Sequence, residues 1–198
     1  GASNPYTTWT TEFLIKNERD FQVWERHVPL PDRIDWTPVL QARERVGDQG
    51  IVRGYIYDWG QLSPWQTFSS CLYGVQPAIM ACIDNPAWVH HVLETLLRKK
   101  LAALGRTDII PYDLVESGGG GASSTVISPA LHREFCLPYD QAQHRAIHEY
   151  GTKIVYHLCG GVMPMLDLVA ENGADGLETM TPPSMGGDCN LAEARRRV

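Results

Sequence analysis

The longest regular pattern of apolar and polar positions lies between residues 86 and 104. Its apolar side chains recur at three- and four-residue steps, at Val89, Val92, Leu93, Leu96, Leu97, Leu101 and Leu104. Because a helix turns once every ~3.6 residues, this spacing gathers them into one stripe along one face. Asn85-Pro86 supplies a cap and a first-turn proline, and Gly105 supplies a stop. The pattern predicts an amphipathic helix over this stretch.

Further segments carry the start and stop signals of helices, in most cases a polar cap or proline at the start and glycine at the end. Thr37-Pro38 opens one of them and Gly47 closes it. Pro138 interrupts a longer helical segment and divides it into two helices. These predicted helices cover residues 17–27, 37–47, 129–137, 139–150, 164–173 and 190–198.

Short apolar runs that favour strands lie between these helices. They cover residues 51–56, 109–115, 153–158 and 174–179. The last three each follow a helix and precede glycine, proline or serine, which is the order of βαβ units in a parallel sheet. We therefore predict one α/β domain over residues 1–198, with βα units over 49–198 and an irregular lead-in over 1–48. Residues 6–15 of the lead-in favour a hairpin.

Composition and charge narrow the class of protein. The chain has 198 residues, 43% hydrophobic and 20% charged, as in soluble globular domains. A net charge of −6 without a basic stripe argues against nucleic-acid binding, and no apolar run reaches the ~18 residues of a membrane helix. Five irregularly spaced cysteines suit reduced thiols, so a cytoplasmic location is expected. The first residues lack Met and signal-peptide features, which suits a processed product or a piece of a longer chain.

Two metal-ligand side chains lie at the end of the predicted strand over 153–158. His157 and Cys159 are two residues apart, so on a strand they point to the same side. The carboxyl ends of parallel strands are where α/β proteins form their active sites. An imidazole and a thiolate that converge there suit zinc. The alternative is a structural histidine beside a packed thiol, because this two-residue spacing alone is not specific to metal sites.

Three segments in order carry a resemblance to a known family. They are ISPALHREFCLPY at 127–139, HLCGG at 157–161 and GADGLE at 173–178. Together they resemble the uroporphyrinogen decarboxylase superfamily, most closely its zinc- and corrinoid-dependent methyltransferase branch. The resemblance is clear over 107–198 and weaker over 12–106. It implies a (β/α)8 TIM-barrel fold, which is incomplete in this chain because such a barrel takes about 250 residues.

The resemblance assigns roles to individual residues. His157 and Cys159 match the zinc-binding pair of the methyltransferase branch, whose third ligand, a late cysteine, has no counterpart here. Glu178 and Cys189 are the candidates to replace it. The implied chemistry is a zinc-activated thiol that accepts a methyl group from a methyl-corrinoid (cobalamin). The implied partners are therefore a corrinoid protein and a small thiol substrate, and a homo-oligomer stays open.

Other polar residues at strand ends are further candidates. Glu116 and Glu178 are candidate catalytic carboxylates, and Ser117 and Tyr156 are candidate substrate contacts. Ser117 lies roughly where the porphyrin decarboxylases carry a serine. The glycines at 118–121 predict a flexible loop between strand and helix rather than a phosphate-binding loop, because no Gly-Lys-Ser/Thr follows.

Two other functions stay open at this point. One is a metal-free uroporphyrinogen decarboxylase, a lyase of porphyrin biosynthesis, although the Arg-rich motif and early Asp of those enzymes have no match. The other is a non-catalytic fragment or assembly module, whose open sheet edges another chain would cover. The histidines His132, His144 and His148 are expected on helix surfaces, and Cys189 is expected in a solvent-facing loop.

Overall fold

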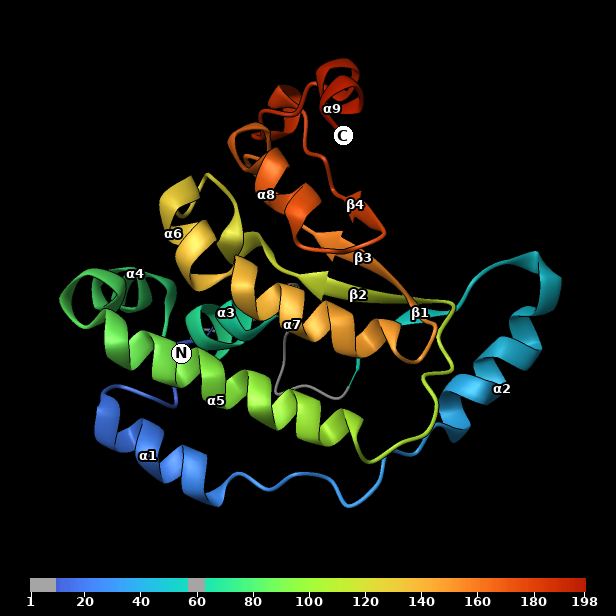
Figure 1. The fold of residues 1–198 in the computed structure, drawn as a ribbon, viewed down its shortest axis with the longest axis horizontal. Helices are drawn as coiled ribbons and strands as arrows, with labels where there is room; N and C mark the ends of the chain where they lie inside the picture. The colour runs from blue at the N-terminus through green and yellow to red at the C-terminus, as the bar shows by residue number, and fades with distance from the viewer. Residues whose placement is uncertain (1–9, 57–62) are drawn as a thin grey trace.

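The sheet consists of four parallel strands in the order β1-β2-β3-β4 (Figure 1). In a computed structural model that describes residues 10–56 and 63–198, the strands are β1 (Arg53–Gly54), β2 (Leu114–Gly118), β3 (Lys153–His157) and β4 (Gly176–Glu178). Helices lie between successive strands, so each connection is a crossover of the βαβ kind. The predicted parallel sheet and α/β fold class are confirmed.

The helices of the described residues lie close to the predicted ranges. They are α1 (Glu18–His27), α2 (Thr37–Val46), α3 (Pro64–Gln66), α4 (Val75–Asp84), α5 (Pro86–Leu104), α6 (Pro129–Phe135), α7 (Leu137–His148), α8 (Leu166–Glu171) and α9 (Leu191–Arg197). The prediction for α5 is confirmed at both ends, and the Asn85 side chain caps it by accepting a hydrogen bond from Trp88 N at 3.2 Å. Pro138 lies in the first turn of α7, so it separates α6 from α7 as predicted.

Two parts of the sequence prediction are wrong. Helical structure within 64–84, formed by α3, a π-helical turn at Thr67–Leu72 and α4, was not predicted. Its start signal is present, because Ser63 caps α3 by accepting a hydrogen bond from Gln66 N at 3.1 Å. The strand predicted over 109–115 instead begins at Leu114, and Pro111, which has no N–H, cannot donate to a strand ladder.

A cluster of buried aromatic rings holds the helices against the sheet. It includes Phe21 of α1, Trp65 of α3, Phe68, Phe135 of α6 and Tyr156 of β3. A fully buried apolar side chain of this size contributes about 1.5–3 kcal/mol. In Figure 1, α5 and α7 lie side by side in front of the sheet, and both the α5–α7 and α7–β3 pairs are in contact.

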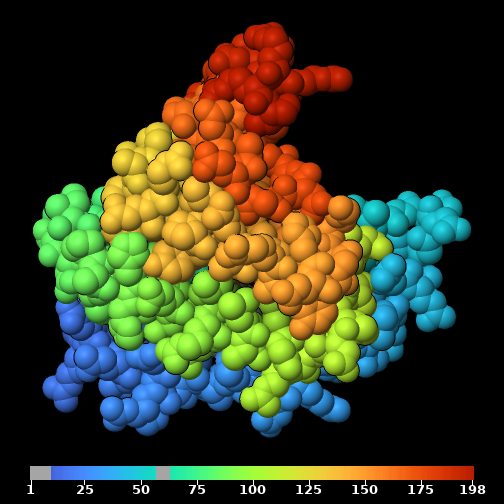
Figure 2. All heavy atoms as spheres, in the orientation of Figure 1, coloured from blue at the N-terminus to red at the C-terminus, as the bar shows by residue number. Residues whose placement is uncertain are grey.

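The start of the described chain is hydrogen-bonded to the rest of the molecule, whereas its C-terminal segment projects outward. Residues 10–15 contain no strand, and residues 6–9 of the predicted hairpin lie outside the described ranges. Ile15 N donates to Leu72 O at 2.9 Å, which ties the start of the chain to the π-helical turn. The C-terminal residues, red in Figure 2, project from the rest of the molecule.

Two further observations on the described residues concern membrane-spanning helices and the cysteines. None of the helices within 10–56 and 63–198 is both long enough and apolar enough to cross a membrane. Within the described residues, Cys82, Cys136, Cys159 and Cys189 form no disulfide.

Candidate functional site

Four polar side chains meet at the carboxyl ends of the strands. Glu116 comes from β2, and His157 and Glu178 are the last residues of β3 and β4. His157 Nδ1 lies 2.7 Å from Glu178 Oε1 and 3.6 Å from Glu116 Oε1. One ligand atom from each of these three residues lies within 4.8 Å of the others, a spacing that could hold a metal ion. With Arg53 of β1 they form what we call the strand-end cluster.

The register of the sheet places the cluster on one face. Glu116 pairs with Val155, two residues before His157, and His157 pairs with Glu178. Arg53 pairs with the residue two positions before Glu116. Because every second side chain of a strand faces the same side, all four members project from one face of the sheet.

Arg53 bridges the two carboxylates of the cluster. Its guanidinium donates to Glu116 Oε2 and Glu178 Oε2, and Nη2 also lies 3.0 Å from Glu178 Oε1. Arg53 was not among the site residues predicted from the sequence. The available signal was an arginine within an otherwise mostly apolar predicted strand at 51–56, which is an unusual place for a charge unless it is paired.

The electrostatics of the cluster favour a bound cation. Burial works to raise the pKa of Glu178, but hydrogen bonds from Arg53 and His157 outweigh it and hold this pKa below its usual range. Glu178 is therefore ionised at neutral pH. Two carboxylates, those of Glu116 and Glu178, face the single guanidinium of Arg53, and carboxylate oxygens are donors that a cation can bind.

Glu178 also orients the His157 ring. A neutral imidazole that donates its Nδ1–H to Glu178 keeps its lone pair on Nε2. This contact holds the His157 ring in place at the strand ends.

Cys159 lies beside the glycine loop rather than in the cluster. Its side chain is exposed, and a Cβ built on Gly120 would lie 2.5 Å from Cys159 Sγ, so the thiol packs directly on this glycine. Gly118 allows the turn that begins the loop, with a φ of +92° and a position for Cβ that would lie 2.5 Å from His157 O. Zinc ligation by Cys159 stays a prediction.

Ser117 and Tyr156 face the helices instead of the strand-end cluster. They are paired neighbours on β2 and β3, one position away from the cluster's face. Ser117 Oγ lies 2.8 Å from His144 Nε2, and the Tyr156 hydroxyl donates to Asp140 Oδ2 at 2.8 Å. Both side chains are fully buried against α7. The structure does not bring them to the cluster, so a role in substrate binding stays a prediction.

Three sequence-based expectations about exposure are wrong. His132 and His144 are buried rather than on helix surfaces, because α6 and α7 present these faces to the core. His132 Nδ1 is hydrogen-bonded to Ala122 O at 2.9 Å, and burial lowers the pKa of His144 to about 4. Cys189 is buried in the larger core cluster rather than solvent-facing.

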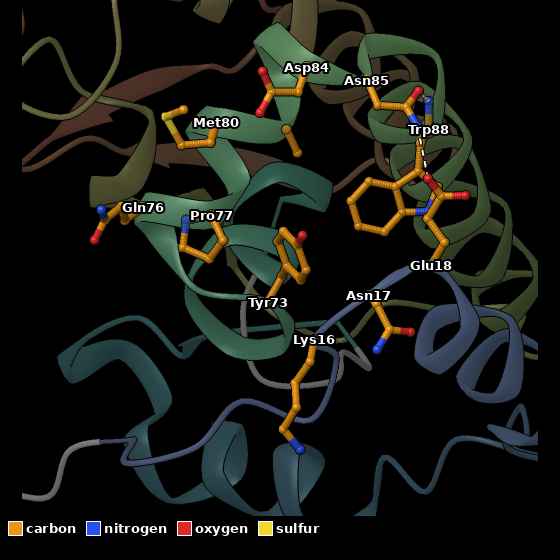
Figure 3. Close-up of a pocket in the computed structure, with 11 residues that line it drawn as sticks. Lys16, Asn17, Glu18, Tyr73, Gln76, Pro77, Met80, Asp84, Asn85 and Trp88 are labelled. Carbon is orange, nitrogen blue, oxygen red and sulfur yellow. Dashed lines mark hydrogen bonds between the residues drawn. The ribbon is translucent and has the colours of Figure 1, made fainter.

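A pocket of about 530 Å³ lies between the start of α1 and the α4–α5 pair (Figure 3). Tyr73, Met80 and Trp88 line it together with the polar side chains of Glu18 and Asp84. No member of the strand-end cluster lines this pocket. The two features therefore involve different residues.

Comparison with known proteins defines the class to which this fold belongs. The chain is similar to the structure of a methyltransferase from Methanosarcina mazei, with a TM-score of 0.56 and 21% sequence identity. The match covers 72% of this chain and 41% of that one, so the chain spans less than half of that protein. The fold is therefore of the α/β barrel type, with the sheet forming part of a barrel.

A match between the sequence and a family profile shows to which family the chain belongs. The uroporphyrinogen decarboxylase (URO-D) family profile matches residues 60–195, which is more than half of the chain. The chain belongs to this family, and the predicted family membership is confirmed. Curated protein sequences give no match to the chain.

Proposed function

We propose that this chain provides the metal-binding half of a methyltransferase of the URO-D family, which transfers a methyl group to a thiol. The observation that supports this most strongly is the anionic strand-end cluster at the carboxyl ends of three neighbouring parallel strands. Active sites of α/β barrels form at this end of the strands. The similarity to a methyltransferase structure supports the same choice.

The donor atoms of the cluster suit a divalent cation such as zinc. Glu116, His157 and Glu178 offer carboxylate oxygens and an imidazole nitrogen, which are ordinary zinc ligands. Cys159, two residues beyond His157, is the proposed further ligand. When bound, zinc would lower the pKa of a substrate thiol so that it reacts as the thiolate.

The chain's own residues prepare this site. Glu178 orients His157 through the 2.7 Å contact to Nδ1. Glu116 is the buried member of the cluster, and its carboxylate adds oxygen donors for a cation at the strand ends. Gly120, in the loop after β2, has no side chain and therefore accommodates the Cys159 thiol that packs on it. We propose a methyl-corrinoid on a partner protein as donor and a small thiol as acceptor.

Charge distinguishes this function from the alternative, porphyrin decarboxylation. Uroporphyrinogen is a polycarboxylate, which needs cationic partners. The one arginine of the cluster is already paired with the carboxylates of Glu116 and Glu178, so it is not free to bind a carboxylate of the substrate. This arrangement favours a metal ion over a polyanionic substrate.

Methyl transfer can be tested with methylcobalamin and 2-mercaptoethanol as probes. In this reaction the carbon–sulfur bond forms as the cobalt–carbon bond breaks, cobalt keeps the electron pair as cob(I)alamin, and the thiol proton goes to solvent. We expect zinc-dependent loss of methylcobalamin absorbance and formation of the methyl thioether, both reduced at least tenfold in His157→Ala. The matched control is His91→Ala, a half-exposed histidine of α5. Uroporphyrinogen turnover without metal, and no thioether, would establish the decarboxylase instead.

A further inference from the structure

Arg53 occupies the carboxylate oxygens that a metal ion would need. Of the four oxygens of Glu116 and Glu178, it donates to three, namely Glu116 Oε2 and both oxygens of Glu178. Glu178 Oε1 is also the oxygen that contacts His157 Nδ1. These are the two carboxylates of the candidate metal group. The guanidinium and a divalent cation therefore have overlapping sites.

We propose that Arg53 is a built-in counter-cation that exchanges with the divalent metal of the strand-end cluster. The inference rests on the proposed function, because it assumes that the cluster binds a metal. Two ionised carboxylates more than balance one guanidinium, but they cannot balance a guanidinium and a divalent ion together. Like charges a few ångströms apart repel strongly in a partly buried site. Metal binding therefore weakens the contacts of Arg53, and Arg53 limits the affinity for metal.

The Arg53 side chain can move while its backbone stays in place. Val52 N donates to Asp113 Oδ2 at 2.8 Å, and Asp113 N donates to Val52 O at 3.0 Å, which fixes β1 against β2. Gly54 lies directly against the Tyr112 ring, where a Cβ would be only 2.3 Å from a ring carbon. In contrast, 39% of the Arg53 side chain is exposed. The guanidinium can leave the carboxylates toward solvent without disturbing the strand.

The exchange predicts opposite effects of one substitution on the metal-free and the metal-bound protein. Arg53→Met removes the partner of two carboxylates, so the metal-free protein should melt at a lower temperature. The same change removes the competing charge, so Zn²⁺ should bind about tenfold more tightly or better. The zinc-induced rise in melting temperature should increase accordingly. A merely structural role for Arg53 predicts only the first effect.

The experiment is titration of Zn²⁺ into the full chain by calorimetry, together with thermal melts with and without zinc. The control is Arg133→Met, which removes the same charge from an exposed arginine paired with Glu171 on the helices. Arg53→Lys serves as the second variant if the methionine variant does not fold. It keeps the charge but loses the planar fork that spans both carboxylates, so it should bind zinc with intermediate affinity.

The outcomes separate this inference from the proposed function. Tighter zinc binding in Arg53→Met with unchanged binding in Arg133→Met supports the exchange. Equal or weaker binding in Arg53→Met, with clear binding by the wild type, overturns the exchange and leaves the metal site in place. Zinc binding by neither protein overturns both. Zinc binding by Arg53→Met alone supports the exchange in its strongest form.

Discussion

Replacement of Asp175 by asparagine tests how β4, and with it Glu178, is held in position. Asp175 lies directly before β4, and its carboxylate accepts hydrogen bonds from Lys153 Nζ at 2.7 Å, His148 Nε2 at 2.8 Å and Ile154 N at 2.9 Å. These contacts join the start of β4 to the start of β3. The asparagine side chain would keep the shape of the aspartate but lose its charge and one of its two acceptor oxygens, so the change weakens these contacts without leaving a cavity.

The structure gives the size of the effect. Burial works to raise the pKa of Asp175, but hydrogen bonds from Lys153, His148 and Ile154 N outweigh it and lower the pKa from 3.8 to about 2. At roughly 1.4 kcal/mol per pKa unit, this shift corresponds to about 2 kcal/mol of folding free energy. Because 27% of the Asp175 side chain is exposed, solvent screening reduces the expected loss to about 1–2 kcal/mol at pH 7.

The sign of the pH dependence follows from the lowered pKa. The unfolded chain takes up a proton near pH 3.8, whereas the folded chain resists protonation until about pH 2. The contribution of Asp175 is therefore complete above about pH 4 and is lost as the pH falls toward 2. The difference in stability between the wild type and Asp175→Asn should shrink over the same interval.

The assay is urea unfolding followed by circular dichroism at pH 7 and at pH 2.5. Asp167→Asn is the control, because Asp167 forms a single ion pair with Arg197 and its side chain is 70% exposed. We expect this control to lose no more than about 0.5 kcal/mol. The reasoning is refuted if Asp175→Asn loses no more than the control at pH 7, or if its loss is as large at pH 2.5.

Two further predictions concern the packing behind the site. Burial lowers the pKa of His144 from 6.5 to about 4, so the melting temperature should fall as the pH drops from 6.5 toward 4. His144→Gln should make this fall in melting temperature smaller. An unchanged pH dependence in His144→Gln would contradict the role given to His144. Gly118→Ala should cost about 1–3 kcal/mol in urea unfolding, because Gly118 has a φ of +92° and its added Cβ would meet His157 O at 2.5 Å. Gly151→Ala is the control, because Gly151 also has a positive φ, +73°, but has open space where the Cβ would lie. An equal loss of stability in both variants would contradict the predicted steric clash at Gly118.

Parts of the fold could be predicted because their signals are local. The cap at Asn85 and the stripe of leucines define α5 without reference to the rest of the chain. Glu116, His157 and Glu178 could also be identified, because each lies at the end of an apolar run and the ends of parallel strands meet. The local pattern and the strand order were enough to place these three residues at the same edge of the sheet.

The role of Arg53 could not be predicted in the same way. Its contact with Glu178 joins residues 125 positions apart, and β1 has only two paired residues, so the local pattern gives little sign of a ladder. The hydrogen bond of His144 likewise joins it to Ser117, which lies 27 positions away on another element. Such pairings appear only when the sheet register is known.

The central claim is that Glu116, His157 and Glu178 form a metal site, and zinc stoichiometry tests it most directly. Each protein would be incubated with Zn²⁺, passed over a desalting column and analysed by mass spectrometry for metal content. We expect about one zinc ion per wild-type chain, and less than about a tenth of that in Glu116→Gln and His157→Ala. Glu171→Gln, an exposed glutamate of α8, should match the wild type. A wild type without zinc, or cluster variants that retain it fully, would contradict the account.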